Sequence, residues 1–301
     1  MDTPLVTVSV ISYNSSDTII ETLDSIYSQS YPRIELIVSD DCSTDDTIDI
    51  CKRWLLIYGD RFESFRLLQS EKNTGVTANC NRAISGVQGE YLKLLAGDDL
   101  LVPEALVEYV NYIQNNNEAV FVFSRVEVFG DNEETVKKFR TIMFNYSFFR
   151  MSPKDQYKWL IGKSHQPIPA ASTFINVKLA INLGVYFYDE RIPMIEDWPK
   201  WIVLSERGVV FHFIDKPLAK YRVSDSSICS GDVHREVFTQ SLARLYCYYQ
   251  FKPTVRLFGV VRGVGVYIRN KALISNNPFW RIAAKIEYGA IKLRDIVRSV
   301  F

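Results

Sequence analysis

The sequence predicts an α/β fold in which a mostly parallel sheet is flanked by helices and a helical extension follows at the C-terminal end. Short β-branched runs such as Leu5–Ile11 and Ile34–Ser39 are apolar at nearly every residue, which is typical of strands buried on both faces. Helical segments alternate with such runs through the first 115 residues, and this alternation favours parallel strands with helices on both faces. With 47% apolar residues in 301, the chain can bury a sizeable core.

Four strand–helix units can be placed in the first 115 residues. The predicted strands are Leu5–Ile11, Ile34–Ser39, Phe65–Gln69 and Tyr91–Leu95. The helices predicted to follow them are Thr18–Ser28, Thr47–Ile57, Val76–Ser85 and Pro103–Gln114. Clusters of Ser, Thr, Asn and Asp precede these helices and can cap their first amide groups.

The pattern changes after Ala119. The strands predicted there are Ala119–Phe129 (one or two strands), Ser172–Ile175, Val209–Ile214 and an edge strand, Leu218–Val223; the helices are Asn176–Leu183, Asp197–Arg207 and Asp232–Phe251. Gly130–Phe139 is predicted to be a charged loop and residues 141–169 an irregular, aromatic-rich segment. A Ser-rich stretch near Ser224–Ser230 divides the chain into a main domain, residues 1–228 with halves 1–115 and 116–228, and a basic helical extension, residues 229–301.

The formal charge is zero in total but unevenly distributed. Between Lys252 and Phe301, ten Lys and Arg residues stand against two acidic residues, so this tail carries +8 and the first 251 residues carry −8. Basic amphipathic helices can pack on the body of the protein, or their cationic face can contact anionic lipid. We favour the peripheral membrane contact. No nucleic-acid-binding motif accompanies the charge, so we expect no nucleic acid partner.

The cysteines and the N-terminal segment indicate a cytoplasmic protein. The five cysteines show neither paired nor metal-type spacing, which is typical of reduced thiols. The N-terminal segment has no signal-peptide pattern, and no run approaches the ~18 apolar residues that a membrane span needs. We therefore expect a cytoplasmic protein whose basic tail contacts the inner face of the plasma membrane.

Polar clusters follow three of the predicted strands, at Ser12–Asn14, Ser39–Asp41 and Gly97–Asp99. The carboxyl ends of parallel strands meet at one edge of a sheet, and ligands of such folds bind there. Helix capping explains many Ser and Asp residues, but it explains adjacent Asp98 and Asp99 poorly because like charges repel. A shared cation would remove that cost, and oxygen ligands suit Mg²⁺ or Mn²⁺, which often bind together with phosphates.

Three blocks of the sequence resemble the family 2 glycosyltransferases, which have the GT-A fold: VSVISYNSSDTIIETLDSIYSQSYPRIELIVSDDCSTDDT, NTGVTANCNRAI and GEYLKLLAGDDLLVPEAL. A weaker likeness resumes at MIEDWPKWIVLSERG and KYRVSDSSIC. The resemblance implies a nucleotide-binding sheet and inverting transfer of a sugar from a nucleotide-diphosphate donor, with a UDP-sugar favoured. It also implies Mg²⁺ or Mn²⁺, a glycan or lipid-linked acceptor hydroxyl, and a role in bacterial cell-surface polysaccharide synthesis.

The resemblance assigns roles to residues of the first two blocks. Ser12, Tyr13 and Asn14 would line the nucleotide pocket, with the Tyr13 ring stacked on the base. Asp41 would accept a hydrogen bond from the imide N–H of the base, which selects uracil or thymine over cytosine. In the second block, the loop with Asn73 and Gly75 would pass close to the nucleotide.

The third block carries the metal motif. By resemblance, Asp98 matches the last Asp of the family's D-x-D motif and is the expected direct metal ligand. Asp99 would bind the metal through water or hold the donor sugar. The first Asp of the motif falls on Ala96.

Two further departures from the family pattern matter. The usual Arg after the N-x-G loop falls on Cys80, with Arg82 close enough to replace its charge, and a His that is common in the last block falls on Ser224. Together with Ala96, these departures motivate an alternative, a catalytically weak or silent nucleotide-sugar-binding protein of the same fold.

Inverting transfer needs a base that removes the proton of the acceptor hydroxyl. The family's base matches Asp197, in a Glu196–Asp197 pair at the start of a predicted helix. Helix capping is the alternative role for Asp197, and Glu196 is a weaker candidate for a supporting position behind the base. Trp198 and Trp201 in the same helix can stack on a sugar or pack in the core.

Overall fold

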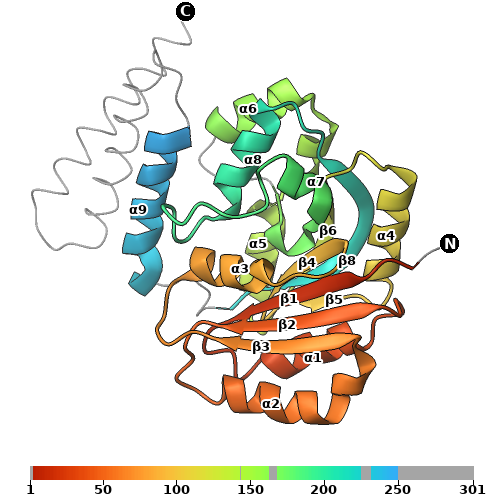
Figure 1. Cartoon of the computed structure of the whole chain (residues 1–301). Coiled ribbons are helices and arrows are strands. Elements are labelled where there is room, and N and C mark those ends of the chain that lie inside the picture. The colour runs from red at the N-terminus through yellow and green to blue at the C-terminus, as the bar shows by residue number, and fades with distance from the viewer. Residues whose placement is uncertain (1–2, 143, 163–167, 225–231, 250–301) are drawn as a thin grey trace, which may run out of the picture. The chain divides into compact units, whose positions relative to one another are not determined.

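The computed structural model describes residues 3–142, 144–162, 168–224 and 232–249 (Figure 1). By its contacts, the chain divides into two compact units. The first comprises residues 1–190 and 196–225, and the second residues 191–195 and 226–301.

The first unit is built on one mixed sheet of eight strands, in the order β3-β2-β1-β4-β7-β6-β8-β5. The strands are β1 (Val6–Ser12), β2 (Ile34–Asp40), β3 (Ser64–Gln69), β4 (Tyr91–Ala96), β5 (Leu100–Leu101), β6 (Phe121–Phe129), β7 (Phe174–Asn176) and β8 (His212–Arg222). β1 pairs in parallel with β2 and β4, and β2 with β3, whereas β7 and β5 are antiparallel to their neighbours. The α/β fold class, with a mostly parallel sheet in its first half, is confirmed.

Helices flank this sheet. They are α1 (Ile19–Tyr27), α2 (Thr47–Tyr58), α3 (Val76–Ser85), α4 (Ala105–Asn115), α5 (Glu133–Ile142), α6 (Pro153–Gly162), α7 (Val177–Asn182) and α8 (Asp197–Glu206), with short 3-10 turns at Gly59–Arg61, Tyr146–Arg150 and Ala170–Ser172. α1 and α2 lie on one side of β1–β3 and α3 lies on the other (Figure 1). All seven residues of β2 are buried, because helices cover both faces of the sheet. The strand–helix units predicted for the first 115 residues are confirmed, with ends that differ by one or two residues.

The predicted charged loop Gly130–Phe139 is wrong, because this stretch forms the start of α5. The Asn132 side chain accepts hydrogen bonds from the amides of Glu134 and Thr135, both at 3.1 Å, which satisfies two free N–H groups of the first turn. Glu133 and Glu134 in that turn also favour the positive end of the helix dipole. The capped first turn therefore stabilises a helix in a segment whose high charge had suggested a loop.

The irregular segment predicted for residues 141–169 also contains a helix, α6. Ser152 precedes it and accepts a hydrogen bond from the amide of Asp155 at 3.3 Å. The Ser152 hydroxyl donates to the Asp155 carboxylate at 2.8 Å. This reciprocal pair caps the helix start immediately before Pro153, a residue that suits the first turn.

The two strands predicted at Val209–Ile214 and Leu218–Val223 are a single strand, β8, and it is not at the edge. Its pairing with β6 shifts register on either side of Arg125, which lies opposite Pro217. A bulge at this point accommodates a proline that cannot donate to the ladder. The short strand β5 pairs with β8 on its other side, so β5 is the edge. β5 was not predicted, since two residues carry no periodicity.

The main core packs α1, α2 and α4 against the sheet. Ile19, Leu23, Leu106 and Tyr109 are fully buried in this cluster. Cys42, Cys51 and Cys80, the cysteines whose side chains are described, are free thiols. This core holds the carboxyl ends of β1, β2 and β4 in register, and those ends carry the polar clusters.

The second unit is described by helix α9 (Asp232–Tyr249) and residues 191–195. Arg244 donates to the carbonyl of Arg191 at 2.9 Å, and the Arg191 guanidinium lies 4.7 Å from the ring centroid of Tyr248. The basic tail after Lys252 lies outside the described residues. In the described part of the chain, we find no helix that combines the length and the apolar character needed to cross a membrane.

Candidate active site

The polar turns after β1, β2 and β4 lie together at one edge of the sheet. The Ser12 hydroxyl donates to the Asp40 carboxylate at 3.1 Å, and the amide of Asp41 donates to the carbonyl of Ser12 at 2.9 Å. The amide of Gly97 donates to the carbonyl of Ile11 at 2.8 Å. The three turns that follow these strands are therefore joined by hydrogen bonds.

Two residues in the first two turns adopt left-handed backbone conformations, Asn14 with φ of 50° and Cys42 with φ of 65°. The amide of Asn14 donates to the Ser43 hydroxyl at 2.8 Å, and the Asn14 side chain accepts from the amide of Thr44 at 2.8 Å. Left-handed conformations cost about 1 kcal/mol or more in residues other than glycine. The cross-turn hydrogen bonds hold the backbone in place, and the ring of Tyr13 is left 44% exposed.

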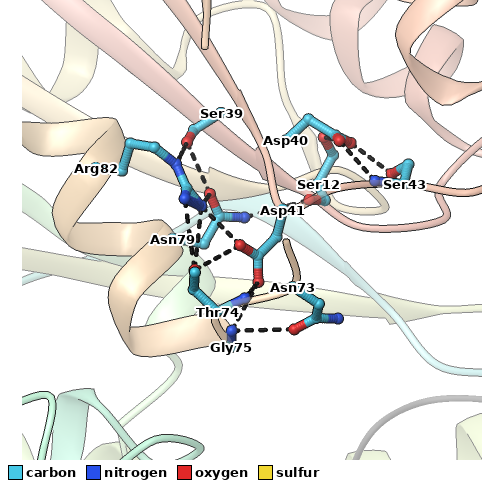
Figure 2. Close-up of polar contacts among 10 residues, drawn as sticks. All are labelled: Ser12, Ser39, Asp40, Asp41, Ser43, Asn73, Thr74, Gly75, Asn79 and Arg82. Carbon is cyan, nitrogen blue, oxygen red and sulfur yellow. Dashed lines mark hydrogen bonds and ion pairs between the residues drawn. The ribbon is translucent and has the colours of Figure 1, made fainter. Parts of the chain in front are cut away.

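Asp41 is the centre of a hydrogen-bond network (Figure 2). Its carboxylate accepts from the amides of Thr74 and Gly75 at 2.9 and 2.7 Å and from the Thr74 hydroxyl at 2.6 Å. It also forms an ion pair with Arg82 at 2.7 Å. A carboxylate offers about four acceptor positions, so protein donors fill all of them.

Arg82 links Asp41 to the strand behind it. Its guanidinium donates to the Asn79 side chain at 3.1 Å and to the Ser39 hydroxyl at 3.2 Å, as Figure 2 shows. Asn73 accepts from the amide of Gly75 at 3.1 Å, and Gly75 has φ of 88°, a conformation that favours glycine. The structure thus brings together the predicted residues Ser12, Asn14, Asp41, Asn73, Gly75 and Arg82.

The acidic turn after β4 is tied to β8 by Arg222. The Arg222 amide donates to Oδ1 of Asp99 at 3.0 Å, and its Nε donates to the carbonyl of Asp98 at 2.9 Å. The Arg222 guanidinium also pairs with Glu21 of α1 at 2.7 Å. One arginine therefore holds the backbone of the turn and compensates its charge.

Asp98 and Asp99 lie in different environments. Burial, followed by the charge of Asp98, raises the pKa of Asp99 well above its usual value. Burial also raises the pKa of Asp98, while Arg222 acts in the opposite direction. Within the described residues, no side chain donates a hydrogen bond to the Asp98 carboxylate, since Arg222 bonds to the backbone carbonyl. Asp98 thus remains available to a ligand, whereas Asp99 is a buried part of the turn.

Behind the acidic turn lies a lysine with no exposed surface, Lys93 of β4. Its ammonium group donates to the carbonyls of Leu94 at 3.1 Å, Thr173 at 3.3 Å and Ala171. Burial lowers the pKa of Lys93 to about 7, with the charge of Asp99 opposing this shift. Lys93 thus joins β4 to the segment before β7.

Asp197 is the first residue of α8 and is 7% exposed. Glu196 precedes it, and burial, followed by the charge of Asp197, raises the pKa of Glu196 to about 8. The buried thiol of Cys80, on α3, interacts electrostatically with both carboxylates. The structure therefore brings the start of α8 to the helix that carries Asn79 and Arg82.

A clamp of hydrogen bonds between α3 and residues 186–188 supports this close approach of α8 to α3. The Asn81 side chain donates to the carbonyl of Tyr188 at 3.0 Å and accepts from its amide at 2.8 Å. The Tyr186 hydroxyl donates to the carbonyl of Ile84 at 3.0 Å. α3 is thereby bonded to the segment that leads to α8.

The tryptophans of α8 pack in the core. Trp198 is 3% exposed and donates to the carbonyl of Leu160 at 3.0 Å, and Trp201 is buried against Phe121 and Phe123. Neither ring is exposed enough to stack on a sugar.

Sequence reasoning missed Arg222 and Asn81 as contributors to this region. Arg222 lies in the block KYRVSDSSIC, which was the signal that could have drawn attention to it. Asn81 lies in the block NTGVTANCNRAI, but nothing in that block points to its hydrogen bonds with Tyr188, 107 residues away.

The sequence and fold were compared with known proteins. A model of the Glycosyl transferase family 2 matches residues 7–172, more than half of the chain. The chain therefore belongs to family 2 of the glycosyltransferases.

Curated relatives cover most of the chain. The "Putative glycosyltransferase EpsE" of Bacillus subtilis (strain 168) is 27% identical over 247 residues, which is 82% of this chain and 81% of the relative. The "UDP-Glc:alpha-D-GlcNAc-diphosphoundecaprenol beta-1,3-glucosyltransferase WfaP" of Escherichia coli is 25% identical over 240 residues, which is 79% of this chain and 84% of the relative.

Solved structures support the GT-A fold. TarS 1-349 of S. aureus in complex with UDP-GlcNAc has a TM-score of 0.60 and 18% identity, covering 89% of this chain and 75% of that one. The mannosyltransferase PcManGT from Pyrobaculum calidifontis in complex with GDP-Man and Mn²⁺ has a TM-score of 0.57 and 19% identity, covering 97% and 81%.

Proposed function

We propose that this protein transfers a sugar with inversion from a UDP-sugar to a hydroxyl of a glycan or lipid-linked acceptor, in the synthesis of a bacterial cell-surface polysaccharide. One observation carries the proposal: the polar turns after β1, β2 and β4 meet at one sheet edge, and the helix that carries Arg82 also meets the start of α8 with Asp197. The UDP-GlcNAc complex of TarS and the UDP-Glc and lipid-linked acceptor in the name of WfaP support the substrate classes.

The donor base would lie at the first two turns. The exposed ring of Tyr13 offers a face for stacking, and Ser12 and Asn14 hold the turn around it. Asp41 would read the imide N–H of the base. Because protein donors fill its acceptor positions, direct recognition requires one of them, such as the Thr74 hydroxyl, to be exchanged for the base.

A divalent ion fits the donor set at Asp98, with Mg²⁺ or Mn²⁺ as the proposed ion. No group of three or more His, Cys, Asp or Glu side chains that could hold a metal exists among the described residues. Mg²⁺ however needs only one or two carboxylates when phosphates and water complete its shell, and the Asp98 carboxylate is available for this. Asp99 would support the turn or hold the donor sugar. When bound, the ion would neutralise charge on the leaving diphosphate.

In the proposed transfer, Asp197 removes the proton of the acceptor hydroxyl as its oxygen bonds to the anomeric carbon. The bond between that carbon and the diphosphate breaks, and the diphosphate keeps the electron pair. Burial and the charge of Asp197 raise the pKa of Glu196, which favours the assignment of Asp197 as the carboxylate of the pair that accepts the proton.

The basic tail is the basis for a proposal about where in the cell the protein lies. We place the protein in the cytoplasm, with the tail from Lys252 to Phe301, which carries +8, against anionic lipid at the inner face of the plasma membrane. Sedimentation with vesicles containing phosphatidylglycerol, compared with vesicles of neutral lipid, measures this contact. Equal binding to both would contradict it.

The test of function begins with a thermal-shift screen of UDP, GDP, CMP and dTDP, each with Mn²⁺. We expect the largest stabilisation with UDP, and slow release of UDP from a UDP-sugar. Asp197→Asn should keep UDP binding and lose transfer. Loss of UDP binding in that variant would instead assign Asp197 to helix capping.

The second candidate function is a nucleotide-sugar-binding protein with weak or no catalysis. Ala96 and Cys80, where the family pattern has Asp and Arg, are the observations that favour it. It predicts tight binding of a UDP-sugar with no release of UDP over many hours, in the presence of Mg²⁺ or Mn²⁺.

A further inference from the structure

The first unit contains a hollow of about 540 Å³ away from the candidate active site. Residues of α4, β6, β8 and the turn Tyr146–Arg150 line it. β8 begins at His212 in the hollow and ends at Arg222, whose amide bonds to the acidic turn. A strand of 11 residues spans roughly 30 Å. The hollow and the acidic turn therefore lie at opposite ends of one strand.

One part of the lining is a group of packed aromatic rings. The rings of Phe149 and Phe213 are stacked with their centroids 4.5 Å apart, and the Tyr146 ring lies 5.4 Å from that of Phe213. The Tyr146 hydroxyl accepts a hydrogen bond from the amide of Val126 at 3.0 Å, which ties this ring to β6. The aromatic surface is therefore already ordered, so a ligand that packs on it loses little affinity to the ordering of side chains.

A charged pair completes the lining. Arg125 forms an ion pair with Asp215, and its guanidinium lies 4.9 Å from the ring centroid of Tyr146. The pairing of β6 with β8 shifts register on both sides of Arg125, which lies opposite Pro217, and bulges of this kind re-aim side chains. The side chains of Arg125 and Asp215 are 43% and 54% exposed. N–H donors and carboxylate acceptors are thus accessible side by side, next to the aromatic rings.

This combination of groups matches a sugar ring. Each sugar hydroxyl both donates and accepts hydrogen bonds, so a guanidinium beside a carboxylate can hold neighbouring hydroxyls of one ring. The C–H groups of a sugar are apolar and pack against aromatic side chains, which offer a large apolar surface. An isolated phosphate matches less well, because Asp215 offsets the charge of one of the two arginines in the lining, Arg125 and Arg150.

We propose that the hollow binds a sugar ring of the glycan on which the enzyme acts, at a distance from the site of transfer. This inference rests on the proposed function, which supplies the glycan. A glycan of several sugars held in the hollow stays concentrated around Asp197, because both sites belong to one unit. The hollow thereby favours long acceptors over short ones.

The test measures binding of the full chain to an array of bacterial surface polysaccharides and their oligosaccharide fragments, followed by calorimetry with the strongest binder. Arg125→Ala/Asp215→Ala removes both members of the charged pair and leaves the net charge unchanged. We expect the affinity for that glycan to fall at least about tenfold, because hydrogen bonds to charged groups are lost. The affinity for UDP should stay the same, since the pair lies away from the polar turns.

The matched control is Lys52→Ala/Asp49→Ala, which removes an ion pair of similar exposure on α2 and should leave glycan binding unchanged. Exposed ion pairs contribute little to stability, so both double variants should fold. If Arg125→Ala/Asp215→Ala does not fold, Asp215→Asn takes its place, because it keeps the shape of the side chain and removes the charged acceptor.

Two results would overturn the proposal: no glycan binds the wild type, or the variant of the hollow binds the glycan as tightly as the wild type. Loss of glycan binding in Asp98→Asn, with binding kept in the variant of the hollow, would place the glycan at the candidate active site and would overturn it as well.

Release of UDP from a UDP-sugar separates this inference from the proposed function. Arg125→Ala/Asp215→Ala should release UDP at the wild-type rate in the absence of an acceptor, because the polar turns are intact. Donor turnover by a protein that binds no glycan in the hollow would overturn the role of the hollow alone. Glycan binding in the hollow without turnover of any nucleotide sugar would overturn the proposed function alone.

Discussion

Arg222 and Asp99, 123 residues apart, are joined by a hydrogen bond of 3.0 Å from the backbone amide of the arginine to the carboxylate. The Arg222 side chain adds a bond to the Asp98 carbonyl and an ion pair with Glu21. The end of β8 thus fixes the turn on which the proposed metal ligand Asp98 lies.

Arg222→Met should destabilise the protein and lower donor turnover. It leaves the partly buried carbonyl of Asp98 without its side-chain donor, at a cost of about 1–3 kcal/mol, and it removes the ion pair with the more exposed Glu21. Arg222→Lys should recover only part of this, since an ammonium group cannot reach two partners in the geometry of a guanidinium. Urea unfolding and UDP release measure both effects. Lys220→Met, with a more exposed side chain on the same strand, is the control. Equal unfolding free energies of Arg222→Met and Lys220→Met would contradict the role of Arg222.

Thr74→Val tests how Asp41 meets the nucleotide. The variant loses the hydroxyl that donates to Asp41 at 2.6 Å but keeps the backbone donors. If the base must replace that hydroxyl, UDP should bind Thr74→Val several-fold more tightly and CMP should not. Calorimetry of both nucleotides with Mn²⁺ is the measurement. Equal changes for UDP and CMP would show that Asp41 does not distinguish them.

Lys93→Met tests the buried lysine through pH. The pKa of Lys93 is 10.5 when unfolded and about 7 in the fold. Between these values the unfolded chain binds more protons, so this group makes the unfolding free energy rise as the pH rises from about 7 to about 10. Lys93→Met removes that rise. In urea titrations, the unfolding free energy of the wild type minus that of the variant should therefore increase with pH above ~7 and stay constant below it. A pH-independent difference would contradict the buried titration, and exposed Lys178→Met is the control.

Asp98→Asn should gain stability and lose activity. Burial raises the pKa of Asp98, which means that its ionised form opposes folding at neutral pH, so the amide should raise the unfolding free energy by about 1 kcal/mol. The same change removes the proposed metal ligand and should abolish Mn²⁺-dependent UDP release. Melting temperature and turnover are measured on one preparation. A less stable variant that still turns over donor would assign Asp98 to the fold instead.

The local elements of the first half were predictable, and the contacts that shape the site were not. α3 has the predicted bounds Val76–Ser85, because the turn before it and its apolar spacing are encoded locally. α5 was missed since its segment is mostly charged and its stability depends on the cap by Asn132. Local sequence patterns indicate where most helices and strands form, and contacts in the folded chain decide the segments where the local pattern misleads.

For the site, the motif blocks placed the residues of the turns correctly at one sheet edge, because the carboxyl ends of parallel strands meet there. The contacts of Arg222 with Asp99 and of Asn81 with Tyr188 span more than 100 residues. No periodicity encodes such contacts, and they appear only when the chain is folded.

The clamp between Asn81 and Tyr188 has a consequence for engineering. The Asn81 carboxamide bonds to both backbone groups of Tyr188 and to the Glu190 side chain at 2.9 Å, so it recognises the path of the main chain, not the identity of residue 188. Chimeras that import the segment before α8 from another family member can therefore change residue 188 without losing these two backbone bonds, provided that the length and backbone course of the segment still meet Asn81. An insertion of one residue in this segment would break the hydrogen bonds between Asn81 and the backbone of residue 188, even if the sequence of the imported segment matched the new acceptor.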